Sequence, residues 1–400
     1  MSHAYIYDGG RSAFGRHGGN LSSVRPDNLL AHVIRTLVER NNFKPQQFED
    51  IIAGNTNQAG EDSRNIARFA GLLAGLPIST GGITINRLCG SGLSAIADAA
   101  RCIQVSEGEL FIAGGVESMS RAPLVLSKAN CAFDRSQEFA DTTLGPRFTN
   151  PDIVAQFGCH TMPQTADNIA ADLHIQRNEC DAFAVASQAK YKAARADGFF
   201  IDEIIPIEVT QGGKQPPRVI ATDEHPRPST TLARLQSLPP LFEGSGVTAG
   251  NASGINDGAA ALIMGNLEAG QIADLKPRAR ILASAIAGVE PRVMGLGPVL
   301  ATRKALARAG LTLADMEVME FNEAFAVQAM GCLKMLEINY EDSRVNSNGG
   351  AIAVGHPLAA SGVRILLTAL RQLERTGGRY GLATMCIGIG QGIAVIIERI

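Results

Sequence analysis

The sequence has no tryptophan, only five tyrosines and only seven cysteines among its 400 residues. No two cysteines have C-x-x-C spacing, so the pattern predicts neither a zinc site nor a redox motif. An odd number of scattered cysteines favours a reducing compartment over a disulfide framework. No apolar run reaches the roughly 18 residues of a membrane-spanning helix, so we expect no membrane partner.

The sequence also lacks a strong charge of either sign, with a formal net charge of -3. We therefore expect no nucleic-acid partner. No secretory h-region is present, and the last three residues, 398–400, do not form a peroxisomal signal. These features together lead us to expect a cytoplasmic protein.

What the chain has is the composition of a globular protein, 45% hydrophobic and 19% charged, at a length that exceeds one hydrophobic core. Apolar residues at helical spacing predict helices at 28–40, 93–105, 178–197 and 361–374. Short continuous apolar runs predict buried strands at 110–113, 316–321 and 393–397. Strands and helices alternate at both ends of the chain, which indicates an α/β fold.

The two ends of the chain resemble each other. A predicted strand at 49–53 leads to Asn55, and Cys89 follows 34 residues later (89 − 55). A second predicted strand, at 317–321, leads to Asn322, and His356 also follows 34 residues later (356 − 322). This repeat predicts an internal duplication, with a site between two similar halves.

Cys89 lies where an apolar strand ends and a helix begins, in the run Leu88-Cys89-Gly90-Ser91-Gly92. The N–H groups and dipole of a helix N-terminus stabilise a thiolate, so we expect a reactive cysteine. The alternative is a small buried side chain, the commonest role of a lone cysteine.

His356 follows three glycines and precedes Pro357, a residue suited to a first helical turn. An imidazole near a cysteine can accept its proton or donate a hydrogen bond to a developing oxyanion. The alternative is a structural or solvated histidine.

Two further segments have candidate residues at strand ends. Asn322 begins the run Asn-Glu-Ala-Phe, and the alternative to a functional role for it is that of a helix N-cap. Cys386 begins the run Cys-Ile-Gly-Ile-Gly-Gln-Gly, which adds a second thiol and backbone N–H groups with little steric cover.

In chain order, the segments of Cys89, Asn322, His356 and Cys386 resemble the four signature segments of the thiolase family, at the family's spacing. Residues 114–120 and 248–258 also look like thiolase segments, so the resemblance covers essentially the whole chain. It implies that Cys89 is the acylated nucleophile, that His356 activates it, and that Cys386 is the acid/base for the acetyl carbanion. It implies one oxyanion hole from His356 and a water held by Asn322, and another from the N–H groups of Cys89 and Gly388.

The resemblance further implies coenzyme A as a co-substrate, a 3-oxoacyl-CoA as substrate, no tightly bound cofactor and no metal. Residues at family positions that contact coenzyme A or line the acyl site are Arg227, Ser253, Met162, Ala324 and Phe325. The chain departs from the family where biosynthetic thiolases have His-Met, because it has Thr161-Met162 with a histidine one place earlier, at His160. Ile389 replaces a frequent glycine in the last segment.

Within the family, residues 57–62, 86–89, 224–228 and 291–295 resemble the degradative 3-oxoadipyl-CoA thiolases of aromatic-compound breakdown. Those enzymes yield succinyl-CoA and acetyl-CoA. A dicarboxylic acyl chain favours an arginine in its pocket, and Arg147 and Arg292 are the candidates. Solvated surface arginines are the alternative for both.

Three alternatives remain open from the sequence. One is a thiolase of broader specificity for 3-ketoacyl-CoA or acetoacetyl-CoA. Another is a condensing, ketosynthase-like enzyme, although ketosynthases usually pair the cysteine with two histidines. The third is a non-catalytic acyl-CoA-binding protein on the same scaffold. No G-x-S-x-G elbow occurs, which disfavours a serine hydrolase.

The architecture implied by the resemblance is two similar α/β halves, each with a mixed five-stranded sheet, in a layered αβαβα arrangement. We expect residues 1–120, completed by 254–276, to form the first half and residues 277–400 the second. Residues 121–253 are expected to form an insertion that covers coenzyme A. Family members are dimers or dimers of dimers, and we expect a homo-oligomer here.

Overall fold

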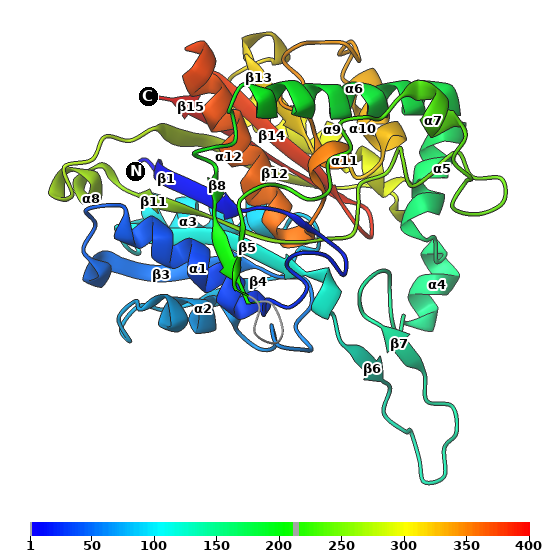
Figure 1. Cartoon of the computed structure of the whole chain (residues 1–400), viewed down its shortest axis with the longest axis horizontal. Helices are drawn as coiled ribbons and strands as arrows, with labels where there is room; N and C mark the ends of the chain where they lie inside the picture. Colours follow the sequence, from blue (N-terminus) through cyan, green and yellow to red (C-terminus); the bar gives the residue numbers. More distant parts are fainter. Residues whose placement is uncertain (1, 211–215) are drawn as a thin grey trace.

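The computed structural model describes residues 2–210 and 216–400. Its main feature is a long mixed sheet with the strand order β13-β14-β15-β12-β1-β11-β5-β3-β4 (Figure 1). The strands of this path are β1 (Tyr5–Ser12), β3 (Phe48–Gly54), β4 (Ile83–Ile85), β5 (Leu110–Ser118), β11 (Asn256–Gly265), β12 (Ala279–Gly288), β13 (Val318–Phe321), β14 (Tyr380–Ile387) and β15 (Gln391–Arg399). This arrangement confirms the expected α/β class.

The sheet consists of an N-terminal and a C-terminal part that meet at β1 and β12. Their contact is short, with the pairs Tyr5–Arg280 and Ile6–Ala279. In the N-terminal part β11 lies between β1 and β5, so the chain returns to this part after residue 253. In the C-terminal part an isolated bridge between Met319 and Val345 takes the place that β4 has in the other part. The short pairing of β1 with β12 thus joins the two expected sheets into one.

Two helices, α3 (Ser91–Gln104) and α12 (Leu358–Thr376), pack against each other at the centre. Because α12 contacts β5 and β11 on one side and β13 and β14 on the other, the sheet folds around it, which gives the expected layers. The other helices of the two parts are α1 (Pro26–Glu39), α2 (Ile66–Ala74), α8 (Leu267–Ile272), α9 (Gly297–Ala309), α10 (Ala326–Met335) and α11 (Ala351–Val354). Short 3-10 turns are η1 (Pro45–Gln47), η2 (Met119–Arg121), η3 (Pro291–Leu296) and η4 (Leu313–Asp315).

Register shows how closely the two parts correspond. Gly54, which precedes Asn55, pairs with Gly115 of β5, just as Phe321, which precedes Asn322, pairs with Thr384 of β14. Both pairings are parallel, and both lie at the carboxyl end of the first strand. The expectation of two similar halves is therefore confirmed at the level of individual strand pairs.

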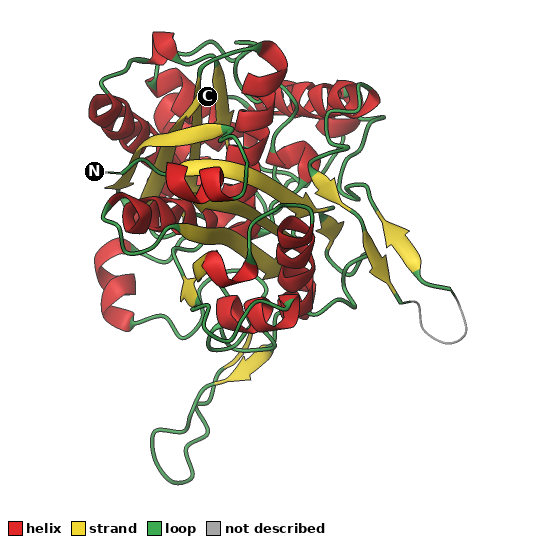
Figure 2. Ribbon diagram, turned by 90° about the vertical axis from the view of Figure 1, so that its left-hand side faces the viewer, coloured by secondary structure: helices red, strands yellow, loops and turns green. Residues whose placement is uncertain are grey.

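Between the parts, residues 121–210 and 216–253 form helices and short strands. The elements are β6 (Leu124–Leu126), β7 (Phe139–Asp141), α4 (Pro151–Phe157), α5 (Met162–Leu173), α6 (Arg177–Ala196), β8 (Ile204–Ile205), β9 (Ile207–Val209), β10 (Arg218–Ile220) and α7 (Leu232–Gln236). Figure 2 shows the hairpins β6–β7 and β9–β10 extending away from the layered body.

A buried ion pair network fastens this segment to the sheet. Arg11 of β1 contacts Glu203 and Asp223 at 2.6 Å each, and all three side chains are buried. Buried charges are tolerated when they are paired in this way. Among the described residues no helix is both long and apolar enough to cross a membrane.

Candidate active site

The first turns of α3 and α12 are in direct contact. Cys89 lies two residues before α3, and His356 lies two residues before α12. A Cβ atom added to Gly92 would clash with the carbonyl oxygen of Ala359, and one added to Gly362 would lie 2.5 Å from the backbone nitrogen of Leu93. Glycine at these positions allows the helix N-termini to meet, which brings Cys89 and His356 into one region as the duplication predicted.

Cys89 is partly buried at the turn between β4 and α3. Burial raises the pKa of its thiol to about 11, and a hydrogen bond from the backbone N–H of Gly388 lowers it only partly. The loss of water around the sulfur therefore works against the thiolate stabilisation expected from the helix N-terminus. The resting group is a neutral thiol whose sulfur is held by the Gly388 N–H.

His356 is buried and has hydrogen-bond partners on both sides of its ring. Its Nδ1 lies 2.6 Å from Oγ of Ser361, and its Nε2 lies 3.4 Å from the amide nitrogen of Asn322. Its backbone N–H donates to Oδ1 of Asn256 at 2.9 Å. Burial lowers the pKa of His356 to about 3, and the nearby charge of Arg364 lowers it further. The imidazole is therefore neutral and can accept a proton.

Asn322 directly follows β13, and its backbone N–H donates to the carbonyl oxygen of Thr384 at 3.0 Å. Its Oδ1 is buried and has no hydrogen-bond partner among the described residues. Buried polar atoms without partners are rare, and they mark places where a water or ligand is accommodated. The position therefore fits the expected role of holding a water beside His356.

Cys386 is buried near the end of β14. Burial raises the pKa of its thiol well above the usual value, and the neighbouring Cys89 raises it further. It packs in one apolar cluster with Ala324, Phe325 and Met162. The structure thus places the second thiol beside the first, in surroundings that keep it protonated.

Glu323 is a buried residue of the site region that sequence analysis did not single out, although it lies inside a quoted motif. Its carboxylate accepts hydrogen bonds from Ser187 Oγ at 2.7 Å, Asn346 Nδ2 at 2.8 Å and the backbone N–H of Ile352 at 3.1 Å. These contacts hold the glycine-rich segment that leads to His356. Ser361 and Asn256, which touch His356 directly, also had no individual sequence signal.

The expected coenzyme A and acyl contacts lie on several neighbouring segments. The backbone N–H of Ser253 donates to Ala324 at 2.9 Å, and Ala252 bridges Phe325, so these two segments are adjacent. Met162 begins α5, and its sulfur would lie 4.0 Å from a Cβ built on Gly388. Arg227 is exposed, and its backbone N–H donates to Gln188 at 2.8 Å. His160 is exposed, and Thr161 caps α5.

The two candidate arginines differ in their surroundings. Arg292 is paired with Asp172 at 2.6 Å, and its side chain is 44% exposed. Arg147 is half-buried in the segment between β7 and α4. Asp172 therefore competes with a substrate carboxylate for Arg292, and no ion pair of Arg147 is seen in the part of the chain that the structure describes.

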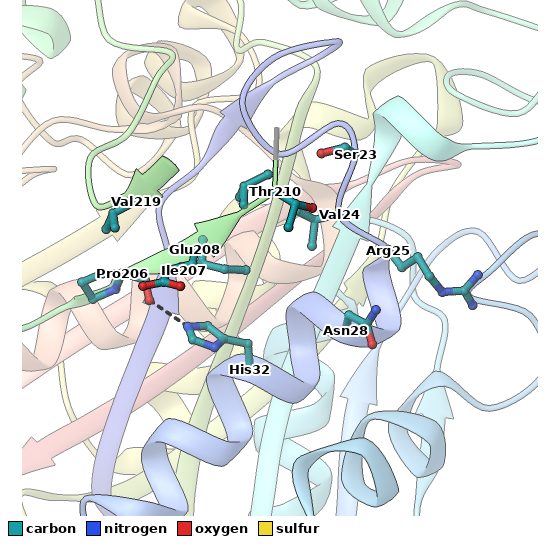
Figure 3. Close-up of a pocket in the computed structure, with 11 residues that line it drawn as sticks. Ser23, Val24, Arg25, Asn28, His32, Pro206, Ile207, Glu208, Thr210 and Val219 are labelled. Atoms are coloured by element: carbon teal, nitrogen blue, oxygen red, sulfur yellow. Dashed lines mark hydrogen bonds between the residues drawn. The ribbon is translucent and has the colours of Figure 1, made fainter. Parts of the chain in front are cut away.

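A cavity of about 740 Å³ lies away from these residues, between α1 and β9 (Figure 3). It is lined in part by Asn28, His32 and Glu208, and His32 Nε2 lies 2.8 Å from the carbonyl oxygen of Pro206. It contains none of the expected site residues. The candidate site is therefore supported by the convergence of chemical groups and not by this cavity.

Comparison with known proteins gives consistent matches over the whole chain. Residues 4–268 match the family model "Thiolase, N-terminal domain", and residues 275–399 match "Thiolase, C-terminal domain". The chain is 55% identical to the beta-ketoadipyl-CoA thiolase of Acinetobacter baylyi, with 100% of both chains covered. It is 54% identical, again with 100% of both covered, to the 3-oxoadipyl-CoA/3-oxo-5,6-dehydrosuberyl-CoA thiolase of Escherichia coli K12. It also resembles the crystal structure of human mitochondrial 3-ketoacyl-CoA thiolase in complex with CoA, with a TM-score of 0.92, 39% identity, and 100% of this chain and 98% of that chain covered.

Proposed function

Because this chain belongs to the thiolase family, we propose that it cleaves 3-oxoadipyl-CoA with coenzyme A into succinyl-CoA and acetyl-CoA. The names of the relatives that are 54–55% identical support this substrate. The observation that carries the chemistry is the contact between the first turns of α3 and α12, which brings the Cys89 and His356 segments together.

In the first half-reaction Cys89 attacks the 3-oxo carbon, and His356 accepts the thiol proton. The carbon–carbon bond then breaks, the succinyl group stays on Cys89 as a thioester, and the acetyl-CoA carbanion takes a proton from Cys386. In the second half-reaction coenzyme A gives its thiol proton to Cys386 and attacks the thioester, and succinyl-CoA leaves as Cys89 takes back a proton from His356. A covalent intermediate of this kind divides one difficult step into two and gives ping-pong kinetics.

The surroundings of each group support these roles. A thiol whose pKa burial raises well above the usual value, as at Cys386, remains an acid at neutral pH. The N–H of Gly388 already contacts the Cys89 sulfur, so it lies beside the oxygen of an adduct formed there. Preorganised donors of this kind contribute roughly 3 kcal/mol each to the stabilisation of the transition state.

A thiolysis assay with 3-oxoadipyl-CoA and acetoacetyl-CoA tests the proposal, with Cys89→Ala as the inactive variant. We expect cleavage of both substrates by the wild type, a higher kcat/KM for 3-oxoadipyl-CoA, and no cleavage by the variant. A higher kcat/KM for acetoacetyl-CoA would favour the broader-specificity thiolase. Binding of coenzyme A without cleavage of either substrate would favour the acyl-CoA-binding protein.

The proposal includes a cytoplasmic homo-oligomer, dimer or dimer of dimers, that uses coenzyme A as co-substrate.

A further inference from the structure

Glu117 and Cys386 occupy the same place in the two halves. Glu117 pairs with Gly258 across β5 and β11, and Cys386 pairs with Gly392 across β14 and β15. In the N-terminal half, the last residue of β3 pairs with Gly115, and Glu117 lies two residues after Gly115. In the C-terminal half, the last residue of β13 pairs with Thr384, and Cys386 lies two residues after Thr384. The duplication therefore puts a second titratable group, buried like Cys386, at the corresponding point in the half that carries Cys89.

The carboxylate of Glu117 joins the two halves. Its Oε2 accepts a hydrogen bond from the backbone N–H of Thr56 at 3.2 Å and from that of Ala359 at 3.4 Å. Thr56 follows β3 in the N-terminal half, and Ala359 is the second residue of α12 in the C-terminal half. A single oxygen atom thus holds one backbone group from each side of the site.

Helix α12 lacks a cap of its own. Its N-cap residue is Pro357, which makes no side-chain capping hydrogen bond. The first N–H groups of a helix need acceptors from elsewhere, and a carboxylate at this end also interacts favourably with the helix dipole. Gly115, two residues before Glu117, allows the carbonyl of Ala359 to approach β5 so closely that a Cβ there would clash. The first turn of α12 is therefore seated on β5 beside Glu117.

We propose that Glu117 is a positioning residue of the active site: from the half that carries Cys89 it caps the helix that follows His356, and so fixes His356 relative to Cys89. This inference rests on the proposed function, because it assigns a task within that reaction. It does not make Glu117 a catalytic residue, since its hydrogen bonds are to Thr56 and to the backbone N–H of Ala359.

The charges around Glu117 give the proposal a second, electrostatic consequence. Burial raises the pKa of Glu117 to about 7, hydrogen bonds from Thr56 and Ala359 oppose the rise, and the charge of Asp62 adds to it. The negative charge of Glu117 in turn raises the pKa of Cys89, whereas the Gly388 N–H lowers it. Of the other titratable groups in this region, Cys386 stays protonated at neutral pH and His356 is neutral. Removal of the Glu117 charge should therefore lower the pKa of Cys89.

The test compares Glu117→Gln, Glu117→Asp and a control, Asp257→Asn. Asp257 is a buried carboxylate of the neighbouring strand β11, and its side-chain hydrogen-bond partners among the described residues are Ser118 and Ser120, not residues of α12. For each protein, thiolysis gives kcat and KM, the pH profile of Cys89 alkylation by iodoacetamide gives the titration midpoint of the thiol, and thermal unfolding gives Tm.

We expect Glu117→Gln to lower kcat by roughly tenfold or more, with KM for coenzyme A little changed, because a misplaced catalytic group mainly affects the chemical step. The midpoint of the alkylation profile should move to lower pH. Glu117→Asp keeps the charge but shortens the reach, so it should lower kcat while the midpoint stays close to that of the wild type. Asp257→Asn should lower Tm and leave kcat, KM and the alkylation midpoint close to those of the wild type.

If Glu117→Gln leaves both kcat and the alkylation midpoint unchanged, the proposal is overturned. It is also overturned if Glu117→Gln and Asp257→Asn lose the same fraction of kcat and the midpoint of Glu117→Gln does not move. If Glu117→Gln does not fold, Glu117→Asp decides: an unchanged kcat there overturns the proposal. If the wild type itself cleaves no 3-oxoacyl-CoA, the proposed function fails, but the alkylation profiles still show whether Glu117 acts on Cys89.

Discussion

The side-chain amide nitrogen of Asn322 lies 3.4 Å from Nε2 of His356, although the two residues are 34 positions apart in the sequence. The oxygen atom of the same amide, Oδ1, is buried and has no hydrogen-bond partner among the described residues. Asn322 is therefore tied to the imidazole on one side and has an acceptor available on the other.

Replacement of Asn322 by alanine should lower kcat for thiolysis by roughly 10²-fold, the usual effect of losing one oxyanion-hole donor. KM should change less, because the amide acts on the developing oxyanion. The corresponding asparagine of the other half, Asn55, is equally buried and donates to the Val116 carbonyl at 3.1 Å. Asn55→Ala is the matched control and should lower Tm without this loss of kcat. Equal losses of kcat in both variants would contradict the assigned role.

Cys386→Ala should block carbon–carbon bond cleavage but not acylation of Cys89. Transfer of an acetyl group from acetyl-CoA to Cys89 requires no carbanion, so mass spectrometry should still find acetylated enzyme. Thiolysis of 3-oxoadipyl-CoA should fall by about 10²–10⁴-fold, the range for loss of a general acid–base group. Cys102→Ala, at a partly buried free cysteine on α3, should behave like the wild type. Loss of the acetylated species in Cys386→Ala would show that the residue acts earlier.

The stability of the protein should depend on pH through His356. Its pKa in the folded protein, about 3, lies below the ordinary value of 6.5, so below pH 6.5 the unfolded chain binds a proton that the folded chain rejects. The free energy of unfolding should therefore fall by at most about 1.4 kcal/mol per pH unit from this group as the pH drops from 6.5 towards 3. Between pH 7.5 and 5.5 the wild type should lose more Tm than His356→Asn. The exposed His160→Asn serves as control and should follow the wild type; a His356→Asn slope equal to that of the wild type would rule out the linkage.

Arg147 and Arg292 can be separated by substrate comparison. Arg292 already pairs with Asp172 at 2.6 Å on the surface, so Arg292→Ala should have a small and equal effect on 3-oxoadipyl-CoA and acetoacetyl-CoA. If Arg147 binds the acyl carboxylate, Arg147→Ala should lower kcat/KM for 3-oxoadipyl-CoA by about 10–100-fold, the equivalent of one charged hydrogen bond, and leave acetoacetyl-CoA unaffected. Equal losses on both substrates would remove Arg147 from the acyl pocket.

Gly115→Ala should damage both stability and activity. Its added methyl group would collide with the backbone of Ala359, which cannot move without displacing the first turn of α12. Overpacking of this kind costs about 1–3 kcal/mol. Gly288 is the control, since a methyl group there meets its nearest atom at 3.9 Å. Thermal unfolding and kcat of the two variants provide the comparison, and a Gly115→Ala protein as stable and active as Gly288→Ala would show that the contact can relax.

The sequence predicted the regular elements well. The helices expected at 93–105 and 178–197 are α3, Ser91–Gln104, and α6, Arg177–Ala196, because their apolar stripes set the burial directly. The buried strand expected at 110–113 is longer, Leu110–Ser118. Its end has glycines and polar residues, whose burial depends on α12 and β11 and not on local pattern.

For the candidate site, the sequence located the motif segments, but it did not single out every residue that shapes the site. The glycine-rich context indicated Cys89 and His356, whereas Glu323 and Glu117 gave no periodic signal, because a buried carboxylate is stabilised by partners that are distant in sequence. The raised pKa of the Cys89 thiol could not be predicted from the sequence for a related reason. The helix N-terminus is visible in the sequence, but the loss of water around the sulfur is visible only in the assembled structure.

The meeting of α3 and α12 has a consequence for how this protein matures after synthesis. The nucleophile comes from a segment made early, and the imidazole and second thiol come from the last quarter of the chain. A partly folded chain with only its first half in place would have no His356 beside Cys89, and its thiol would lack the Gly388 N–H. Recovery of activity during refolding should therefore track the final docking of the halves, which makes turnover a reporter of completed assembly.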